Sequence, residues 1–270
     1  MAIQATSAVP SAAANGKHGH SLISDEKFHQ LYTLALNFHF AVERGVTVLA
    51  GREAALAGVA ADLRPEDLLI AEHDASLLEP PAAQAHATHH AQLQSVAATS
   101  ERIIDALSMA VANRMRHNHR VTVLFFPQDA AGHLLTEARA VAAGARLPVI
   151  FVEQGADSAP SRRSAPKPQP ALDLMCIPVD AHDVIAIYRV AHESITRARQ
   201  GNGPTRILCH TLANAGAESS NAVAKLEAWL MARGLPAQQW RQQIEANIQT
   251  SNSTEWQGTS GNGELPENAA

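Results

Sequence analysis

The chain has 270 residues, of which 46% are hydrophobic and 17% are charged, and its formal charge is −5. This balance argues against a nucleic-acid-binding protein, because no basic excess is available to neutralise phosphates. No apolar run approaches the roughly 20 residues that cross a bilayer, so we expect no membrane segment. The N-terminus lacks the basic and leucine-rich regions of a secretory signal, and the two cysteines are isolated. We therefore expect a globular protein of the cytoplasm.

The first part of the chain predicts a disordered lead-in followed by two helices. Residues 1–20 are rich in Ala, Ser and Gly without a period, and we expect one folded domain over residues 21–249. Ser24 is a typical helix N-cap, with acidic residues in the turn that follows. A second helix is expected over 53–61. Apolar residues at helical spacing predict the buried face of the first helix: Phe28, Leu31, Ala35, Phe38 and Val42.

The middle of the chain predicts a βαβ unit. Residues 75–100 are expected to form a connector, after which helical spacing returns. Residues 121–126 and 147–152 are continuous apolar runs, typical of strands buried on both faces, with a helix over 134–144 between them. This order implies a parallel sheet with a right-handed crossover. The helix after the connector is indicated by Ile103, Ile104, Leu107, Val111 and Met115.

The C-terminal part continues the alternation of strands and helices. We expect an exposed loop over 155–172 and a disordered tail over 250–270. The fold class is therefore α/β, with a parallel sheet and helices on both faces. The remaining elements are expected as strands over 174–179 and 206–209 and as helices over 181–200, 219–233 and 237–249.

Several segments, taken in order, resemble one protein family. G-R-E-A-A-L-A-G-V-A-A-D-L-R-P-E-D (51–67) resembles a G-x-E-A-x-x-x-G-x-x-x-x-L-x-P-x-D motif, and L-P-V-I-F-V (147–152) resembles a strand that leads into a metal site. P-V-D-A-H-D-V-I-A-I-Y (178–188) and A-R-Q-G-N-G-P-T-R-I-L (198–208) are similar to V-D-G-x-D-V followed by R-x-G-x-G-P-x-L-I. The family is the α subunit of the thiamine-diphosphate-dependent first component of 2-oxo acid dehydrogenases, such as pyruvate, branched-chain and acetoin dehydrogenases. The resemblance implies a thiamine-diphosphate-binding-like fold.

The resemblance also implies a cofactor site, whose ligands are altered here. In the family, thiamine diphosphate is held through Mg²⁺ by the Asp of a G-D-G motif and an Asn of a later N-N pair. Mg²⁺ prefers oxygen ligands. Here Gln128 stands at the Asp position, and Gly155 and Ala156 stand at the N-N pair, so a carboxylate and two amides are missing. A shift of one residue would make Asp129 a metal ligand, whereas the alternative is that Asp129 caps the following helix.

Other functional positions of the family are replaced as well. A Tyr-Arg pair that contacts the cofactor falls near Glu72 and Asp74, whose carboxylates would repel a diphosphate. An Arg and a His of a later loop fall on Ala213 and Ala217, and the chain is shortened over 75–100. We therefore expect a pseudoenzyme that has lost cofactor binding and serves as a structural or regulatory subunit, paired with a β-type subunit or with itself.

Two other functions remain open. The chain is either a working dehydrogenase α subunit with rearranged metal ligands, or a module that uses the emptied pocket for another small ligand or partner. His86, His89 and His90 have a spacing that could present imidazoles to Zn²⁺ or Ni²⁺, although a solvated connector also explains them. Cys209 and His210 are neighbours in an expected strand and point to opposite faces, which disfavours a Cys–His dyad.

Overall fold

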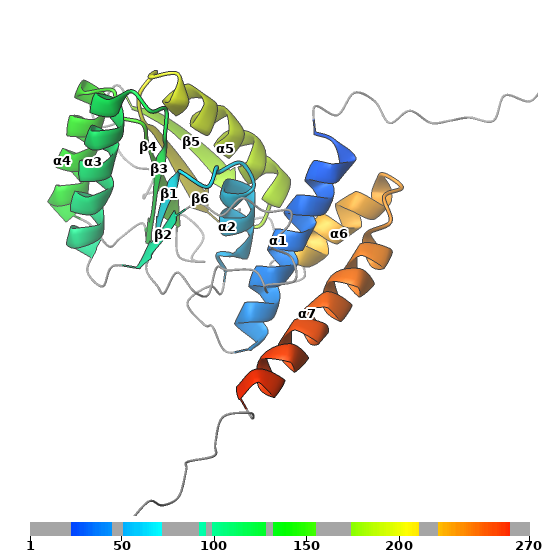
Figure 1. Cartoon of the computed structure of the whole chain (residues 1–270). Coiled ribbons are helices and arrows are strands. Elements are labelled where there is room, and N and C mark those ends of the chain that lie inside the picture. The colour runs from blue at the N-terminus through cyan, green and yellow to red at the C-terminus, as the bar shows by residue number, and fades with distance from the viewer. Residues whose placement is uncertain are drawn as a thin grey trace, which may run out of the picture.

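The structure is a computed structural model that describes residues 23–44, 51–71, 92–95, 99–127, 132–154, 174–210 and 221–259. Within these ranges all strands join one parallel sheet, in the order β2-β1-β3-β4-β6-β5 (Figure 1). The expected α/β class with a parallel sheet is therefore confirmed. The strands are β1 (Leu68–Ala71), β2 (Gln92–Ser95), β3 (Thr122–Pro127), β4 (Val149–Gln154), β5 (Met175–Asp180) and β6 (Thr205–His210).

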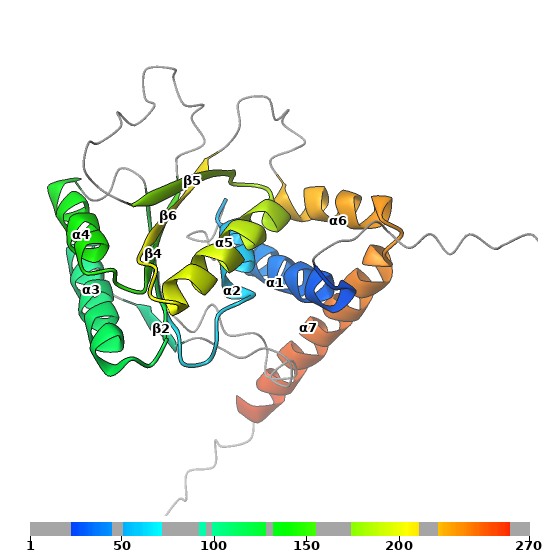
Figure 2. The ribbon, with the colours of Figure 1, turned by 90° about the horizontal axis from the view of Figure 1, so that it is seen from above.

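Helices cover both faces of the sheet (Figure 2). Helices α3 and α4 pack on one face, while α1, α2, α5 and α6 lie on the other, with α7 packed against α1 and α6. The helices are α1 (Asp25–Glu43), α2 (Glu53–Ala60), α3 (Thr99–Arg116), α4 (Gly132–Gly144), α5 (Val184–Arg199), α6 (Ala222–Ala232) and α7 (Ala237–Thr259).

The central strands contribute to two separate cores. Val123 and Phe125 of β3 join the core beneath α1, α2 and α5, whereas Leu124 and Phe126 join the core beneath α3 and α4. Successive side chains of a strand point to opposite faces, so a strand covered on both faces is apolar throughout. This confirms the interpretation of the apolar run over 121–126, and the parallel pairing of β3 with β4 confirms the βαβ unit.

The N-terminal helix also forms as expected. The Ser24 Oγ accepts a hydrogen bond from the Lys27 N–H at 3.2 Å, and Asp25 and Glu26 lie in the first turn. Phe28 and Leu31 are buried, together with Ala35 and Phe38, while Val42 is half-buried. The capping hydroxyl satisfies one of the free N–H groups at the helix start, which fixes where α1 begins.

Three elements differ from the sequence-based expectation. The connector over 75–100 contains strand β2, which has a single apolar residue, Leu93, and pairs with β1 through its backbone, so no apolar pattern marks it. Strand β1 was not expected from the sequence, because its four residues are too few to show a period. Helix α7 continues to Thr259, beyond the end expected at 249, because each residue added to a formed helix gains a hydrogen bond without needing an apolar face. The segments 1–20 and 155–172 lie outside the described residues.

Helix α3 exposes part of its apolar series. Ile103 is buried, but Ile104, Val111 and Met115 are 54%, 39% and 75% exposed. The face that packs on the sheet is formed instead by Ile103 with the small residues Ala106 and Ala110. No helix in the described ranges is long and apolar enough to cross a bilayer.

Gly58 sets the distance between α2 and α5. A Cβ at this position would lie 2.8 Å from Ile187 Cγ2 and 3.0 Å from the Tyr188 backbone N. Contacts this short leave no room for a methyl group, and the backbone of α5 cannot move aside as a flexible side chain would. Close helix packing therefore explains the second glycine of the G-x-E-A-x-x-x-G motif.

We predict that Gly58→Ala lowers the free energy of unfolding by about 1–2 kcal/mol, because overpacking outweighs the gain in helix propensity. Gly144→Ala is the matched control, since a Cβ there meets nothing within 4 Å. That variant should be as stable as the wild type or slightly more stable. Urea unfolding of both variants measures the difference, and equal stability of the two would contradict the packing argument.

Candidate functional site

The candidate site lies at the carboxyl ends of the strands, where open parallel sheets bind ligands. Pro127 ends β3 and Gln154 ends β4, and the two are register partners, so these strands end side by side. The predicted site residues Gln128, Asp129 and Gly155 follow directly in the chain. They lie outside the described residues, and their roles stay predictions. The structure shows that the strands leading into both motif positions are neighbours.

Glu153, one residue before the end of β4, is held between two arginines. Its side chain is 1% exposed. Oε1 accepts from Arg206 Nε at 2.6 Å and Oε2 accepts from Arg206 Nη2 at 2.5 Å, while Arg139 of α4 pairs with Oε1. Burial, together with the neighbouring Arg206 charge, lowers the pKa of Arg139 to about 10. Both oxygens of this carboxylate are therefore engaged.

Sequence reasoning did not single out Glu153. A carboxylate at the end of an apolar, buried strand could have indicated this residue, because a buried charge needs a partner. The partners come from α4 and β6, which are distant in sequence and become neighbours only through the sheet order. The triad carries two positive charges against one negative charge, so it is net positive.

A second carboxylate at this edge is also engaged. Asp180 Oδ2 accepts from Lys225 Nζ at 2.6 Å, and Oδ1 accepts from the His182 N–H at 3.1 Å. Burial raises the pKa of Asp180, but the hydrogen bonds from Lys225 and His182 outweigh burial and hold it below its ordinary value. Asp183 caps α5 by accepting from the Ala186 N–H at 2.9 Å. Both acidic residues of the V-D-A-H-D-V segment thus have structural roles.

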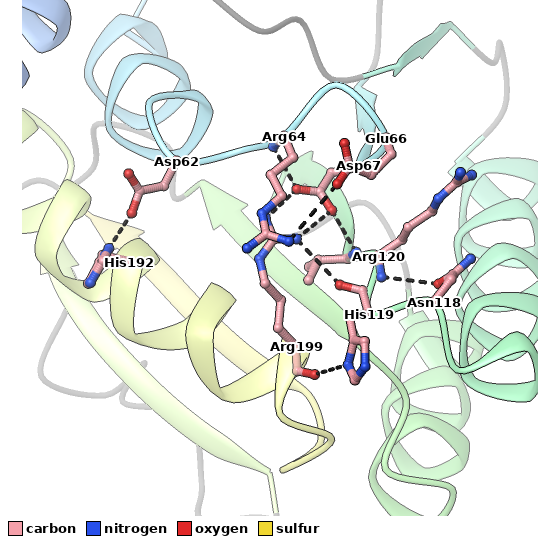
Figure 3. A network of polar contacts seen from close by, with 10 residues as sticks. Asp62, Arg64, Glu66, Asp67, Asn118, His119, Arg120, His192 and Arg199 are labelled. Carbon is pink, nitrogen blue, oxygen red and sulfur yellow. Dashed lines mark hydrogen bonds and ion pairs between the residues drawn. The ribbon is translucent and has the colours of Figure 1, made fainter.

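The opposite, amino-terminal edge of the sheet carries a polar network centred on Asp67 (Figure 3). Asp67 is fully buried and accepts from the Arg64 N–H at 2.7 Å and from the Val121 N–H at 2.8 Å. Arg199, the last residue of α5, donates to both carboxylate oxygens, at 3.1 and 2.5 Å. His119 Nδ1 lies 3.0 Å from the Arg199 carbonyl oxygen. The Asp of the L-x-P-x-D motif thus ties the turn before β1 to β3 and α5.

A smaller cluster beside this network joins α1, α2 and α5. Asp62 accepts from Lys27 Nζ at 3.0 Å and pairs with His192 Nδ1 (Figure 3), and the Tyr188 hydroxyl lies 3.4 Å from Oδ1. Burial raises the pKa of Asp62, but the hydrogen bonds from His192 and Lys27 outweigh it and lower the pKa. Burial, with the nearby Asp62 charge, raises the pKa of Tyr188 to about 12. Each group here has a partner within the fold.

A pocket of about 240 Å³ opens next to Arg199. It lies between the C-terminal ends of α3 and α5, whose free carbonyl groups favour cations. The arginines at these helix ends supply that charge. This pocket is on the edge opposite the predicted cofactor position. It is lined by Asn113, Arg114, His117, His119, Pro148, Ala198, Arg199, Gln200 and Gly201.

Two other candidates from the sequence give no site in the described residues. Cys209 is buried in the core, and burial, with the charge of Asp180, raises the pKa of its thiol to about 12, so it is no nucleophile beside His210. No group of three His, Cys, Asp or Glu residues in the described ranges could hold a metal ion. The cluster of His86, His89 and His90 lies outside those ranges.

Comparison with known proteins identifies the family. The family described as "Dehydrogenase E1 component" matches residues 82–221, which is more than half of the chain. The chain belongs to the dehydrogenase E1 component family. The match spans β2 to β6, and so includes both strands that lead into the predicted cofactor position. The resemblance to E1 α subunits is confirmed.

Individual relatives of the E1 family support the same placement. The chain is 31% identical over 120 residues to the α subunit of acetoin:2,6-dichlorophenolindophenol oxidoreductase of Bacillus subtilis (strain 168), covering 41% of this chain and 36% of that protein. It is 35% identical over 100 residues to the chloroplastic pyruvate dehydrogenase E1 component subunit alpha-3 of Arabidopsis thaliana, covering 34% and 23%. The matched region is thus about a third or less of each relative's length.

One solved structure shows a weaker similarity. An X-ray structure described as a thiamin diphosphate-dependent enzyme from Mycobacterium smegmatis has a TM-score of 0.41 and 15% sequence identity. The match covers 60% of this chain and 31% of that chain. A likeness of this size carries no argument about the site.

We predict that Asp67→Asn destabilises this E1 family member by about 3 kcal/mol, because Arg199 loses its counter-charge in a largely buried position. Glu66→Gln is the control from the same turn, since its carboxylate is 40% exposed and 4.0 Å from Arg64 Nη1. The control should change stability by less than about 0.5 kcal/mol. Chemical unfolding measures the stability of both variants. If Asp67→Asn were as stable as the wild type, the network would not have the structural role assigned to it.

We also predict a pH-dependent effect of Lys225→Met. The pKa of Asp180 lies below its ordinary 3.8, so this pair stabilises the fold above pH 3.8 and the effect fades below it. Burial lowers the pKa of Lys225, but the hydrogen bond to Asp180 and the charges of Asp183 and Asp180 together outweigh burial and raise the pKa above its ordinary 10.5. The effect of the pair is therefore lost above that pH. At pH 7 the variant should be less stable than the wild type by about 0.5–1 kcal/mol. Well below the pKa of Asp180 and well above the pKa of Lys225, the two proteins should be equally stable.

Urea unfolding across this pH range measures the difference, with Lys225→Arg as the variant that keeps the pair. A stability difference that is constant with pH would show that the lost packing of the lysine stem, rather than its charge, causes the change.

Proposed function

We propose that this E1 family member is a non-catalytic α-subunit-like protein that serves as a structural or regulatory partner of a β-type subunit. The proposal rests on the side chains that stand at the family's metal-ligand positions. Gln128 replaces the Asp, while Gly155 and Ala156 replace the N-N pair. Mg²⁺ requires oxygen ligands, and two of these three positions supply no side-chain oxygen. The residues present do not fit thiamine diphosphate held through Mg²⁺ in the manner of the family.

The described surroundings offer no obvious replacement ligand. Glu153, close in the chain to Gly155, has both oxygens bound by Arg139 and Arg206. Asp180, at the end of β5, is engaged by Lys225. If either carboxylate bound a metal ion instead, the basic side chains that now pair with it would lose their counter-charge. For the buried triad this would lower the stability of the fold. The protein therefore lacks an available carboxylate among the described residues at this edge.

The contrast between scaffold and chemistry supports the same proposal. Gly58, Asp67 and Asp183 match family motifs, and each has a packing, bonding or capping role in this fold. The replaced positions are those that would contact the cofactor. Loss confined to the chemical positions is what a chain retained for its fold would show. The matched relatives are α subunits by name, which makes a β-type subunit the partner to test.

A working enzyme with rearranged ligands is the second candidate. It is favoured by Asp129, a carboxylate one position after Gln128. In that case Asp129 would hold the metal, and the chain with a β subunit would decarboxylate a 2-oxo acid. The two functions differ in whether the wild-type chain binds the cofactor at all.

We predict that isothermal titration of the full chain with thiamine diphosphate and Mg²⁺ shows no micromolar binding, with or without a 2-oxo acid dehydrogenase β subunit from the same organism. The triple variant Gln128→Asp, Gly155→Asn, Ala156→Asn restores the family ligands and serves as the gain-of-binding comparison. Co-elution with the β subunit in size-exclusion chromatography tests the partner role.

Micromolar binding by the wild type would overturn the proposal. If Asp129→Ala then abolished that binding, the second candidate would be established. Failure of the chain to co-elute with any β subunit would leave the partner role without support, whatever the titration shows.

A further inference from the structure

Exposed apolar side chains concentrate on the outer face of α3 and α4. In the described ranges seven large hydrophobic side chains are exposed, and five of them lie on these two helices. The two others, Met175 and Met231, lie on β5 and α6 and are isolated from this face. Concentrated apolar exposure of this kind marks an interaction surface more often than scattered exposure does. The five are Ile104, Val111, Met115, Leu134 and Val141.

The three residues of α3 form one stripe. Ile104, Val111 and Met115 are separated by seven and four positions, which places them on one side of a helix. The opposite side of α3 packs on the sheet, so the stripe points outward. Ser108, also exposed, lies between them and is small enough to let another helix approach. Figures 1 and 2 show α3 and α4 side by side, with no helix or strand of the described part outside them.

Charges are divided between the two ends of this face. Glu101 and Asp105 lie in the first half of α3, and Arg116 lies at its end. Helix α4 runs in the same direction as α3, because each helix precedes a strand of the same parallel sheet. Arg146, just after the end of α4, is exposed and adds to the basic end. Glu137, exposed on α4 between Leu134 and Val141, adds one acidic group nearer the middle. The face is therefore acidic in its first half and basic at its far end, with the apolar stripe of α3 running between them.

We propose that this outer face of α3 and α4 binds a second copy of the chain, with the two α3 helices antiparallel about a two-fold axis. In this arrangement the acidic end of each copy meets the basic end of the other, and the apolar stripes cover one another. A parallel arrangement would place like charges together. A two-fold interface requires a self-complementary surface, and the charge pattern of this face meets that requirement.

The size of the face indicates a weak dimer. Helix α3, with 18 residues, spans about 27 Å. Two helices of this kind bury less than the roughly 1,600 Å² of a standard stable interface. The dimer should therefore dissociate at micromolar concentration and weaken as salt screens the charged ends. Cofactor binding has no part in this inference, which stands or falls separately from the proposed function.

Sedimentation velocity of the full chain over a concentration series tests the dimer. We expect Val111→Glu to weaken dimerisation at least about tenfold, because it places a charge in the centre of the apolar stripe. Met231→Glu is the matched control, since Met231 is 45% exposed but lies on α6. The control should dimerise like the wild type. Far-UV circular dichroism and thermal unfolding establish that both variants remain folded.

Charge reversal distinguishes this dimer from unspecific apolar association. Reversing only the acidic end, with Glu101→Arg and Asp105→Arg, should abolish dimerisation. Reversing the basic end as well, with Arg116→Glu and Arg146→Glu, should restore it, because the face is self-complementary again. A wild type that stays monomeric at about 100 µM would overturn the inference. It would equally be overturned if Val111→Glu dimerised normally, or if the fully reversed variant did not regain the dimer.

Discussion

The buried carboxylate of Asp67 is the interaction on which the arrangement of this fold depends. It lies where three chain segments meet: the turn between α2 and β1, the start of β3 and the end of α5. A fully buried charge is stable only when hydrogen bonds and a counter-charge replace the lost water, and here two backbone N–H groups and Arg199 do so. The register of β1 beside β3 and the docking of α5 are thereby fixed at one point. The packing at Gly58 then holds α2 against α5 on the same side of the sheet.

This dependence explains which part of the family resemblance survives in the chain. Asp67 and Asp183 belong to motifs of the E1 family, yet here one organises a strand junction and the other caps a helix. Both roles serve the fold itself and need no bound cofactor. Of these two, Asp183 lies within residues 82–221, the range that matches the family.

Much of the fold could be predicted from the sequence, because the signals were local. Ser24 marks a helix start, and the run from 121 to 126 reads as a strand covered on both faces. Strand β2 could not be predicted in this way, since only one of its four residues is apolar and the strand pairs with β1 through its backbone. The apolar series of α3 marked the helix but did not distinguish its inner face from its outer face. Ile103 faces the sheet with the small residues Ala106 and Ala110, whereas Ile104, Val111 and Met115 face outward.

The candidate site was predicted less completely. The sequence predicted two motif positions, and the structure places the strands that lead into them side by side. No sequence pattern indicated that Glu153 would be shared by Arg139 and Arg206, because one arginine comes from a helix before β4 and the other from a strand after β4. Long-range ion pairs of this kind leave no spacing pattern in the sequence.

The contrast between the two cysteines has a consequence for the chemistry of the whole chain. The thiolate is the reactive form of cysteine, and burial, which raises the pKa of Cys209 to about 12, keeps that thiol protonated and out of reach of solvent. Cys176, on β5, is exposed. Since the sequence has only these two cysteines, thiol oxidation and thiol alkylation converge on a single position at the edge of the sheet. The fold therefore leaves one accessible thiol, on the edge strand that follows residues 155–173 in the chain.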